Sequence, residues 1–362
     1  MDSVTQFALG AGVGAAVLGR RMGVRKAALT GGLLGTLPDA DVFFPFDDPV
    51  ESFVLHRSVT HSLLVHAVAA PVIGELLCRA FASLREARLQ TYSAVFLCFA
   101  THALLDAMTV YGTQLFWPLW PEPVGLGSLF IIDPLYTLPL LVMVVWALFR
   151  KEWTPRYGKA LTAALVFSTA YVGWSAAAQQ IVETRAERVL ARAGMAPERL
   201  LAIPTPFNTL FWRAIAVEGS RYVNLYIPIL GGDEAVTAYA HPRKPADVAC
   251  WTGNGVVKTL TDFSDGFVRY DVKDGTVVMS DLRMGLTPRY VFRFSVAKQN
   301  GSAFADIAPQ RMPVVRTGEG DMDWLKAGLV GEPAVRPVEA MAQVQLGDRQ
   351  LAATALTRSP AC

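Results

Sequence analysis

Histidine and aspartate side chains gather in three short clusters, each at one end of an apolar run in the first third of the chain. Imidazole and carboxylate groups are costly to place against membrane-grade apolar segments, so their presence there indicates a functional site. We interpret the three clusters as parts of one metal site at the mouth of a membrane bundle. The clusters are residues 38–41 (P-D-A-D), 56–64 (H-R-S-V-T-H-S-L-L) and 101–106 (T-H-A-L-L-D).

The spacing of these side chains suits metal chelation. His102 and Asp106 are four residues apart, so on a helix they project from one face, one turn apart. Such a pair can chelate one ion, or the aspartate can orient the ring of a liganding histidine. We expect His61 in the first turn of its helix, where the helix dipole favours the neutral, metal-binding ring. Nitrogen plus carboxylate ligation suits a divalent ion, zinc first, with manganese or iron as alternatives. The predicted metal ligands are Asp39, His56, His61, His102 and Asp106.

Other polar residues are predicted to take part in the chemistry. Asp106 and Asp41 are the predicted general bases, with Asp133 as a further candidate carboxylate. Arg57 is predicted to hold an anionic group such as phosphate, or to pair with an aspartate. His241 is expected to be a surface residue. Each motif alone has an ordinary structural explanation, because single histidines and Asp-x-Asp sequences at helix ends are common caps and polar contacts.

The composition indicates which elements position these residues. The chain has 362 residues, of which 52% are hydrophobic and 18% charged, and its mean hydropathy is +0.32. This is too apolar for an ordinary soluble protein and indicates the membrane class, while a net charge of +2 argues against a nucleic-acid partner. About six apolar segments are predicted, the first two short for a span of about 20 residues. They cover residues 7–19, 27–37, 63–81, 92–108, 130–149 and 160–178.

Lysine and arginine alternate between the predicted turns in a way that sets the orientation. They fill the first, third and fifth turns, which the positive-inside rule assigns to the cytoplasm. All three polar clusters then fall at the outer ends of their segments, so residues distant in sequence reach one membrane depth. The basic residues are Arg20, Arg21, Arg25, Lys26, Arg79, Arg85, Arg88, Arg150, Lys151, Arg156 and Lys159.

The second half of the chain has a different pattern. Beyond Thr184, charged residues are interspersed normally and short stretches alternate between apolar and polar residues. Asp274-Gly275 between two such stretches is a hairpin signal. We therefore predict an α-helical polytopic membrane domain over residues 1–180 and a small β-rich (α+β) periplasmic domain over residues 181–329. The tail, residues 330–362, is assigned no fold.

Four segments together resemble the YdjM-like membrane-bound metal-dependent hydrolases. They read P-D-A-D-V, H-R-S-V-T-H-S-L-L, H-A-L-L-D-A-M-T-V-Y-G-T-Q-L-F-W-P-L and I-D-P-L-Y-T-L-P-L. The resemblance covers about residues 1–149. It implies a multi-pass inner-membrane hydrolase whose metal residues map onto Asp39, His56, His61, His102 and Asp106. A weaker similarity to zinc-dependent phospholipase C and the P1-type nucleases, which also use H-x-x-x-D helix pairs, favours phosphoester chemistry.

These observations lead to two expectations from different functional classes. The first is an inner-membrane hydrolase whose divalent ion activates water. Its expected partners are the lipid bilayer and an amphipathic or phosphate-containing substrate. The alternative is a non-catalytic membrane scaffold or receptor, with a metal-stabilised bundle and a partner-binding periplasmic domain. The sequence names neither the substrate nor the oligomeric state.

Overall fold

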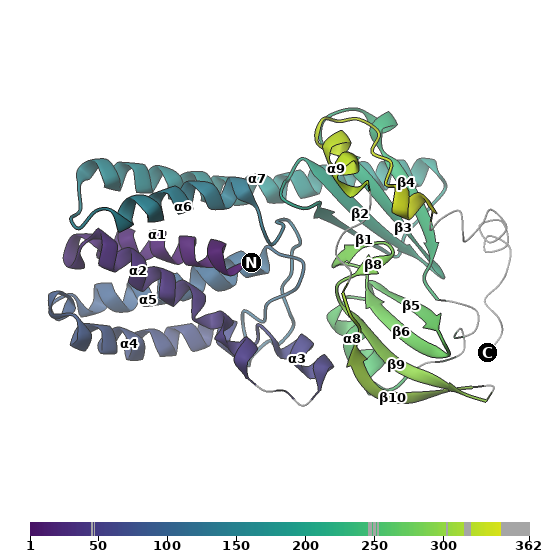
Figure 1. The fold of residues 1–362 in the computed structure, drawn as a ribbon, viewed down its shortest axis with the longest axis horizontal. Helices are drawn as coiled ribbons and strands as arrows, with labels where there is room; N and C mark the ends of the chain where they lie inside the picture. The colour runs from purple at the N-terminus through teal and green to yellow at the C-terminus, as the bar shows by residue number, and fades with distance from the viewer. Residues whose placement is uncertain are drawn as a thin grey trace. The chain divides into compact units, whose positions relative to one another are not determined.

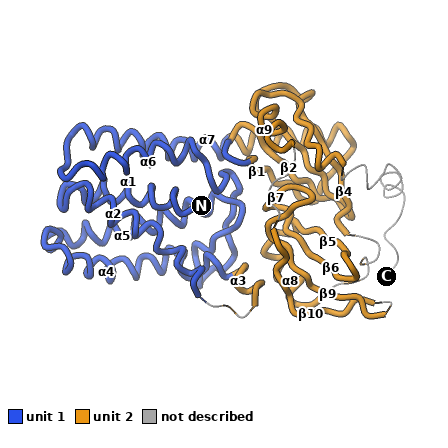
Figure 2. The backbone as a smooth tube through the Cα atoms, in the orientation of Figure 1, with its two compact units in different colours: residues 1–45, 55–177, 206–208 blue, residues 46–54, 178–205, 209–362 orange. Residues whose placement is uncertain are grey.

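The computed structural model divides the chain into two compact units (Figures 1 and 2). The helical unit comprises residues 1–45, 55–177 and 206–208, and the β-rich unit comprises residues 46–54, 178–205 and 209–362. The structure describes residues 1–44, 46, 48–244, 248, 251, 253–301, 303–314 and 320–341.

Long helices form the helical unit, and they lie side by side in Figure 1. Short 3-10 helices connect several of them at the ends of the bundle. The last long helix continues from the helical unit into the β-rich unit. The helices of this unit are α1 (Ser3–Met22), α2 (Val24–Thr36), η1 (Pro38–Phe43), η2 (Val59–His61), α4 (Leu63–Ala80), η3 (Ala82–Leu84), α5 (Arg88–Ala107), α6 (Pro134–Leu148) and α7 (Pro155–Arg192). The short helix α3 (Pro49–Leu55) falls almost wholly in the β-rich unit.

Glycines bring α1 and α2 into very close contact. A Cβ atom added at Gly10 would lie 2.4 Å from the carbonyl oxygen of Gly31, and one added at Gly35 would lie 2.6 Å from that of Gln6. No larger residue fits at these positions without moving the backbone, which is the small-residue packing expected between membrane helices. The end of α2 is therefore fixed against α1, and η1 with its aspartates follows directly.

Three turns that carry basic residues meet at one end of the bundle. The amide of Val24, in the turn after α1, donates to the carbonyl of Lys151 in the turn before α7 at 3.1 Å. The side chain of Gln90, at the start of α5, donates to the carbonyl of Val17 at 2.6 Å. The turns after α1, α4 and α6 consequently lie at a common level.

Two helices among the described residues, rather than six, are long and apolar enough to cross a membrane by length and composition. They are α4 and α7, and α6 is a shorter apolar helix of 15 residues. The other predicted segments have physical reasons to fall short. The α2 helix has only 13 residues, and α5 carries His102 and Asp106 within its apolar run.

Antiparallel sheets form the β-rich unit. One four-stranded sheet has the order β1-β2-β3-β4, a second has the order β10-β9-β6-β5, and β7 pairs with β8. The strands are β1 (Arg199–Pro204), β2 (Phe211–Glu218), β3 (Arg221–Pro228), β4 (Thr237–Pro242), β5 (Val268–Lys273), β6 (Thr276–Asp281), β7 (Gly285–Leu286), β8 (Arg289–Tyr290), β9 (Arg293–Asn300) and β10 (Ala303–Arg311). The remaining helices are η4 (Asp233–Ala235), α8 (Gly255–Phe263) and α9 (Asp321–Leu329).

The predicted hairpin is present between β5 and β6. Asp274 and Gly275 join Lys273 to its partner Thr276, and both turn residues have positive φ angles of 50° and 69°. Two consecutive positive φ angles are what a two-residue type I′ turn requires, and this explains the Asp-Gly sequence. The helical first half and sheet-rich second half confirm the predicted α+β layout at this coarse level.

The second half of α7 supplies the core of the first sheet. Ala178, Val182, Ala186 and Leu190 recur every four residues on one face and pack on buried side chains of β1, β2 and β3 such as Trp212. The predicted domain limits stay predictions, and residues 342–362 of the tail lie outside the described residues.

Candidate metal centre

Four side chains from three elements converge at one end of the helical unit. Asp39 comes from η1, His61 from η2, and His102 and Asp106 from α5. The Nε2 atoms of the two histidines are 3.0 Å apart. Asp39 Oδ1 lies 3.5 Å from each of these nitrogens, and Asp106 Oδ2 lies 3.4 Å from His61 Nε2 and 3.6 Å from His102 Nε2. Three of the four residues are buried, and Asp39 is half-buried.

These separations fit a small ion held by four ligands. Four donor atoms placed about 2.1 Å from a tetrahedral ion are about 3.4 Å from one another. The distances of 3.0–3.6 Å between the two nitrogens and two oxygens match this value. The cluster could therefore hold a metal ion without rearrangement of the side chains.

The ring of His102 is held so that its outer nitrogen faces the cluster. Its Nδ1 lies 2.6 Å from the carbonyl oxygen of Gly35, to which only a protonated nitrogen can donate. The proton on Nδ1 leaves a lone pair on Nε2, directed at the other three ligand atoms. A backbone carbonyl on the second ring nitrogen is a common partner of a liganding histidine. The close α1–α2 contact at Gly35 thus also sets the state of this ring.

The ring of His61 is oriented by its neighbour Thr60. The Thr60 hydroxyl lies 3.0 Å from His61 Nδ1 and donates to Asp41 Oδ2 at 3.0 Å, so it accepts the Nδ1 proton. The Nε2 atom again keeps its lone pair. His61 lies in η2, before Ser62, the residue that caps α4. The expected place in the first turn of α4 is therefore wrong, and a hydroxyl rather than a helix dipole selects the ring state.

Asp106 is anchored through one oxygen and presents the other. Gln6 Nε2 donates to Asp106 Oδ1 at 2.9 Å, and the amino group of Met1 contacts the same oxygen. Oδ2 is buried and has no hydrogen-bond partner among the described residues. The Arg57 guanidinium, whose Nε lies 3.0 Å away, partly balances the charge of this oxygen, and a cation between the four ligand atoms would stabilise it further.

Arg57 lies beside the cluster in a constrained conformation. Its Nε is 3.0 Å from Asp106 Oδ2, its NH1 donates to the Thr109 hydroxyl at 3.1 Å, and its guanidinium lies 5.0 Å from the centre of the Tyr111 ring. The residue is buried and has a φ of 67°, in the left-handed region that non-glycine residues seldom adopt. Such strained residues are concentrated at functional sites.

His56 and Asp41 form a separate pair next to the four-residue cluster. His56 Nδ1 lies 3.0 Å from Asp41 Oδ1, and the backbone amide of Arg57 donates to Asp41 Oδ2 at 3.0 Å. With Asp39 they make a second group of close metal-ligand atoms. His56 was predicted to be a ligand together with the four converging residues, but it lies in this second group instead. Asp41 accepts a hydrogen bond from Thr60, the residue that orients His61.

The carboxylates of the site attract positive charge. Burial raises the pKa of Asp39 and of Asp41, but the imidazole rings beside them, His102 and His61 in the first case and His56 in the second, bring each pKa below its ordinary value. Burial lowers the pKa of His61, and the adjacent carboxylates of Asp106 and Asp39 more than offset this, so the pKa is raised. Both effects show that the site favours a positive charge between rings and carboxylates, which a divalent cation supplies.

Comparison with known proteins identifies the family. A family model described as YdjM inner membrane protein matches residues 1–182, which include every residue of the cluster. The chain belongs to this family. No curated protein and no solved structure matches the chain. The YdjM family is an inner-membrane family, so the helical half is that of an inner-membrane protein. The match itself shows neither catalysis nor the identity of a metal.

Two further predictions for this YdjM family member are wrong in the structure. Asp133 lies outside the metal-ligand groups and caps α6, accepting from the amide of Leu135 at 2.9 Å and from the hydroxyl of Tyr171 at 2.8 Å. His241 is buried rather than exposed, and its Nε2 lies 3.0 Å from Glu339 Oε1.

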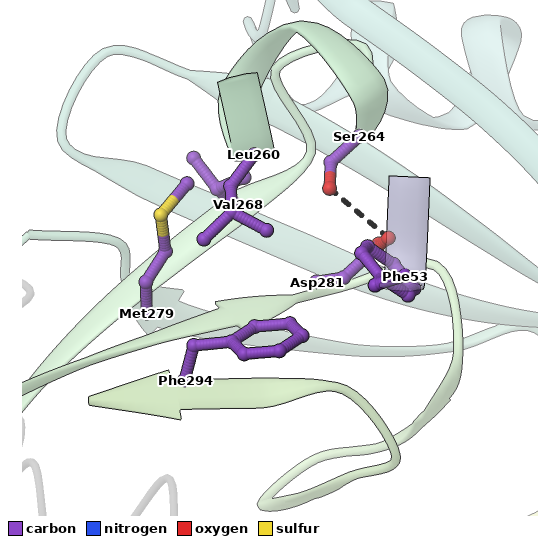
Figure 3. A pocket seen from close by; sticks show the side chains of 7 residues that line it. All are labelled: Phe53, Leu260, Ser264, Val268, Met279, Asp281 and Phe294. Carbon is purple, nitrogen blue, oxygen red and sulfur yellow. Dashed lines mark hydrogen bonds between the residues drawn. The ribbon is translucent and has the colours of Figure 1, made fainter. Parts of the chain in front are cut away.

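The β-rich unit contains a small cavity that is a poor candidate for a ligand site. It has a volume of about 10 Å³, room for about one water molecule. Apolar side chains such as Phe53, Met279 and Phe294 line most of it, and its two polar residues satisfy each other, since the Ser264 hydroxyl donates to Asp281 at 3.0 Å (Figure 3).

The residues that orient the ligands were not among the predicted site residues. Thr60 stands inside the H-R-S-V-T-H segment beside its histidine, so its position in the motif was a usable signal. Gln6 is a fully buried amide in a helix of mainly small apolar residues, and polar residues in such helices are normally functional. The carbonyl of Gly35 leaves no signal in residue type, because every residue has one.

Proposed function

We propose that this chain is a divalent-metal-dependent hydrolase that cleaves a phosphoester at the outer face of the inner membrane. One observation carries the proposal. Four ligand atoms from η1, η2 and α5 converge, and the second ring nitrogen of each histidine is already bonded elsewhere, so both lone pairs face a common centre. A cluster that served only to stabilise the bundle would pair its donors with its acceptors.

Two nitrogens and two carboxylate oxygens at tetrahedral separations favour zinc, with manganese or iron as alternatives. Four protein ligands fill a tetrahedral site, so such an ion would polarise the substrate and lower the pKa of a water molecule from a further, fifth coordination position. Asp39, His61, His102 and Asp106 would hold it. Asp39 is the most exposed of the four, with 21% of its side chain accessible against 0% for each of the others, so substrate would arrive from its side.

The charges around the site support an anionic substrate. The carboxylates of Asp39 and Asp106 together balance a divalent cation, and the two histidines are neutral in the ring states described above. Arg57 then adds a positive charge next to the ion, 3.0 Å from the ligand oxygen Asp106 Oδ2. A planar guanidinium is well suited to bind two phosphate oxygens at once. We assign Arg57 to hold the phosphoester.

The Asp41–His56 pair supports a proton-transfer role. Asp41 accepts the proton on His56 Nδ1, which leaves Nε2 able to take a proton from the attacking water. The His56 side chain is 23% exposed and its ring centre lies 6.0 Å from that of His61, so it adjoins the site and is open to solvent. Asp106, whose Oδ1 is held by Gln6 and whose Oδ2 lies among the ligand atoms, is assigned to ligation instead.

The proposal includes a multi-pass topology with a periplasmic β-rich unit. Support comes from the turns after α1, α4 and α6, which meet at one end of the bundle and carry most of the basic residues of the helical half. The positive-inside rule assigns that end to the cytoplasm. Reporters fused after Arg88 or Lys159 should be cytoplasmic, and a reporter in the β-rich unit should be exported. A cytoplasmic β-rich unit would contradict this orientation.

Hydrolysis of bis(p-nitrophenyl) phosphate by the detergent-purified full chain tests the activity. We expect chelation to abolish it and added zinc or manganese to restore it. His56→Ala should lower the rate about 10²–10⁴-fold, the contribution of a general base, while the protein keeps its metal. Loss of metal in His56→Ala would instead make His56 a ligand. Bound metal without hydrolysis of this or any long-chain phosphoester would favour a non-catalytic scaffold.

A further inference from the structure

An open apolar groove of about 450 Å³ runs along α4. Six residues of α4 between Leu64 and Ile73 line it, together with Pro118 from the loop after α5. Its lining is almost wholly apolar, and the volume lies in the range of small-molecule sites. Val68 and Val72 in the groove are 72% and 61% exposed, so no described residue of the helical unit covers this face of α4.

The groove begins where the candidate metal centre ends. His61 is one of the four candidate metal ligands, and the next residue, Ser62, caps α4. The groove opens at Leu64, three residues after His61. Two hydrogen bonds fix the loop that carries Pro118, the other wall of the groove, to the start of α4. The Ser62 hydroxyl donates to the Trp117 carbonyl at 2.6 Å, next to Pro118. The amide of Leu63 donates to the Leu115 carbonyl at 2.9 Å. The groove and the metal centre therefore share one rigid junction.

The surroundings of the groove indicate what fills it. The α4 helix is one of the two candidate membrane spans and belongs to an inner-membrane family, so bilayer lipid covers its exposed face. From Leu64 to Ile73 the groove runs about 13.5 Å along the helix axis. Half of the hydrocarbon core of a bilayer is about 15 Å thick. The groove thus accommodates an acyl chain of one leaflet, from the interface to near the midplane.

We propose that this groove binds the acyl chain of a membrane phospholipid whose phosphate lies at Arg57 and the candidate metal centre. The proposal rests on the proposed function and narrows its substrate to a phospholipid. Bilayer lipid is as apolar as the groove, so the hydrophobic effect does not select the occupant. Selection comes from the head group, held by Arg57 and the ion, while the groove sets the position of the chain behind it.

Two alanines of α4 provide a matched test. Ala69 lines the groove, and Ala67 is exposed, does not line it, and lies about 200° round the helix. Phenylalanine at position 69 fills the groove, whereas phenylalanine at position 67 points away from it. Ala69→Leu adds less bulk and provides a second variant if Ala69→Phe does not fold. Metal content reports whether each variant has kept the neighbouring site.

The full-length variants are extracted into mild detergent from nanodiscs of phosphatidylglycerol and phosphatidylethanolamine, and retained phospholipid is counted by native mass spectrometry. We expect Ala69→Phe to lower retention about tenfold, equivalent to about 1.4 kcal/mol, and Ala67→Phe to leave it unchanged. Hydrolysis of phospholipid should fall with retention, and hydrolysis of bis(p-nitrophenyl) phosphate should not.

Equal retention in Ala67→Phe and Ala69→Phe, or equal loss in both, would overturn the groove as an acyl-chain site. Selective loss of lipid in Ala69→Phe, in protein that hydrolyses neither substrate, would support the groove and refute the proposed function. The two failures are therefore distinguishable.

Discussion

Two buried polar clusters, one in each unit, differ in how their groups are paired. In the β-rich unit Glu339 Oε1 accepts from Asn224 at 2.6 Å and lies 3.0 Å from His241 Nε2, while Oε2 accepts from the Tyr226 hydroxyl. In the helical unit His61 Nε2, His102 Nε2 and one oxygen of each of two aspartates face one another. Among the described residues Asp106 Oδ2 accepts no hydrogen bond, although it forms an ion pair with Arg57 Nε at 3.0 Å.

The difference separates a structural cluster from a candidate site. Around Glu339, donors face acceptors, so removal of a member leaves polar groups unpaired and the fold is weakened. At the candidate metal centre, ring nitrogens and carboxylate oxygens face one another with Arg57 at one side, 3.0 Å from Asp106 Oδ2, and a cation at their centre would stabilise this arrangement further. Burial and residue type are similar in the two clusters, since each contains buried histidine and carboxylate. The direction of the lone pairs distinguishes them.

The largest effect on stability is expected in the β-rich unit. Glu339→Ala leaves Asn224, Tyr226 and His241 without their shared acceptor, which should lower the free energy of unfolding by about 3–5 kcal/mol. Denaturant unfolding of the purified protein measures it. Glu332→Ala, at an exposed position nearby, is the control and should change little. Unchanged stability in Glu339→Ala would mean that the paired cluster is not structural.

Asp106→Asn tests the unpaired cluster. A neutral amide is a poor substitute for a carboxylate ligand, so metal affinity should fall by more than the roughly 100-fold that is the upper range for an orienting residue. Competition with a chelator of known affinity measures it. Asp133→Asn is the matched control, because Asp133 is also a buried aspartate of the helical unit but caps α6. Equal affinity in the two variants would exclude Asp106 as a ligand.

A smaller effect is expected at Thr60, which holds the His61 ring. Thr60→Val keeps the shape of the side chain and removes the hydroxyl between His61 and Asp41. Metal affinity should fall about 10–100-fold, the usual range for residues that orient a ligand. Thr60→Ser keeps the hydroxyl and should restore most of the affinity. Failure of serine to do so would point to packing of the threonine methyl group instead.

An effect of similar size is expected from the backbone contact behind His102. A Cβ at Gly35 would lie 2.6 Å from the Gln6 carbonyl and 2.9 Å from Gly10 Cα, so Gly35→Ala should destabilise the helical unit by about 1–3 kcal/mol. It should also weaken metal binding, because the Gly35 carbonyl holds His102. Gly173→Ala in α7 meets nothing within 4 Å and should be neutral or slightly stabilising in thermal unfolding. Equal stability and equal metal affinity in Gly35→Ala and Gly173→Ala would contradict the role of the Gly35 contact.

Residue spacing predicted some of the residues of the candidate metal centre. Which other polar residues join it depends on contacts that the spacing does not reveal. The i, i+4 spacing of His102 and Asp106 correctly placed both on one face of α5, because helix periodicity is set by sequence alone. Asp133 is an aspartate like Asp106, but its carboxylate accepts hydrogen bonds from two backbone amides and from the Tyr171 hydroxyl. These partners depend on how α6 and α7 pack.

The same limit applies to the fold. Alternation and the Asp274-Gly275 turn predicted the β-rich half, since local propensity determines hairpins. Apolar runs predicted helices in the first half but not their lengths. In the part of the chain that the structure describes, only α4 and α7 are long and apolar enough for a span. The burial of His241 depends on Glu339, 98 positions away in the chain, and no local pattern predicts such a contact.

Metal analysis of the detergent-purified full chain tests the central claim most directly. Wild-type protein is compared with His61→Ala and His102→Ala, and with His241→Ala, whose ring bonds Glu339 in the paired cluster. The account predicts about one transition-metal ion per chain in the wild type and in His241→Ala, and loss of the ion in the other two variants. Full retention of metal in folded His61→Ala and His102→Ala would contradict the metal centre and the function built on it.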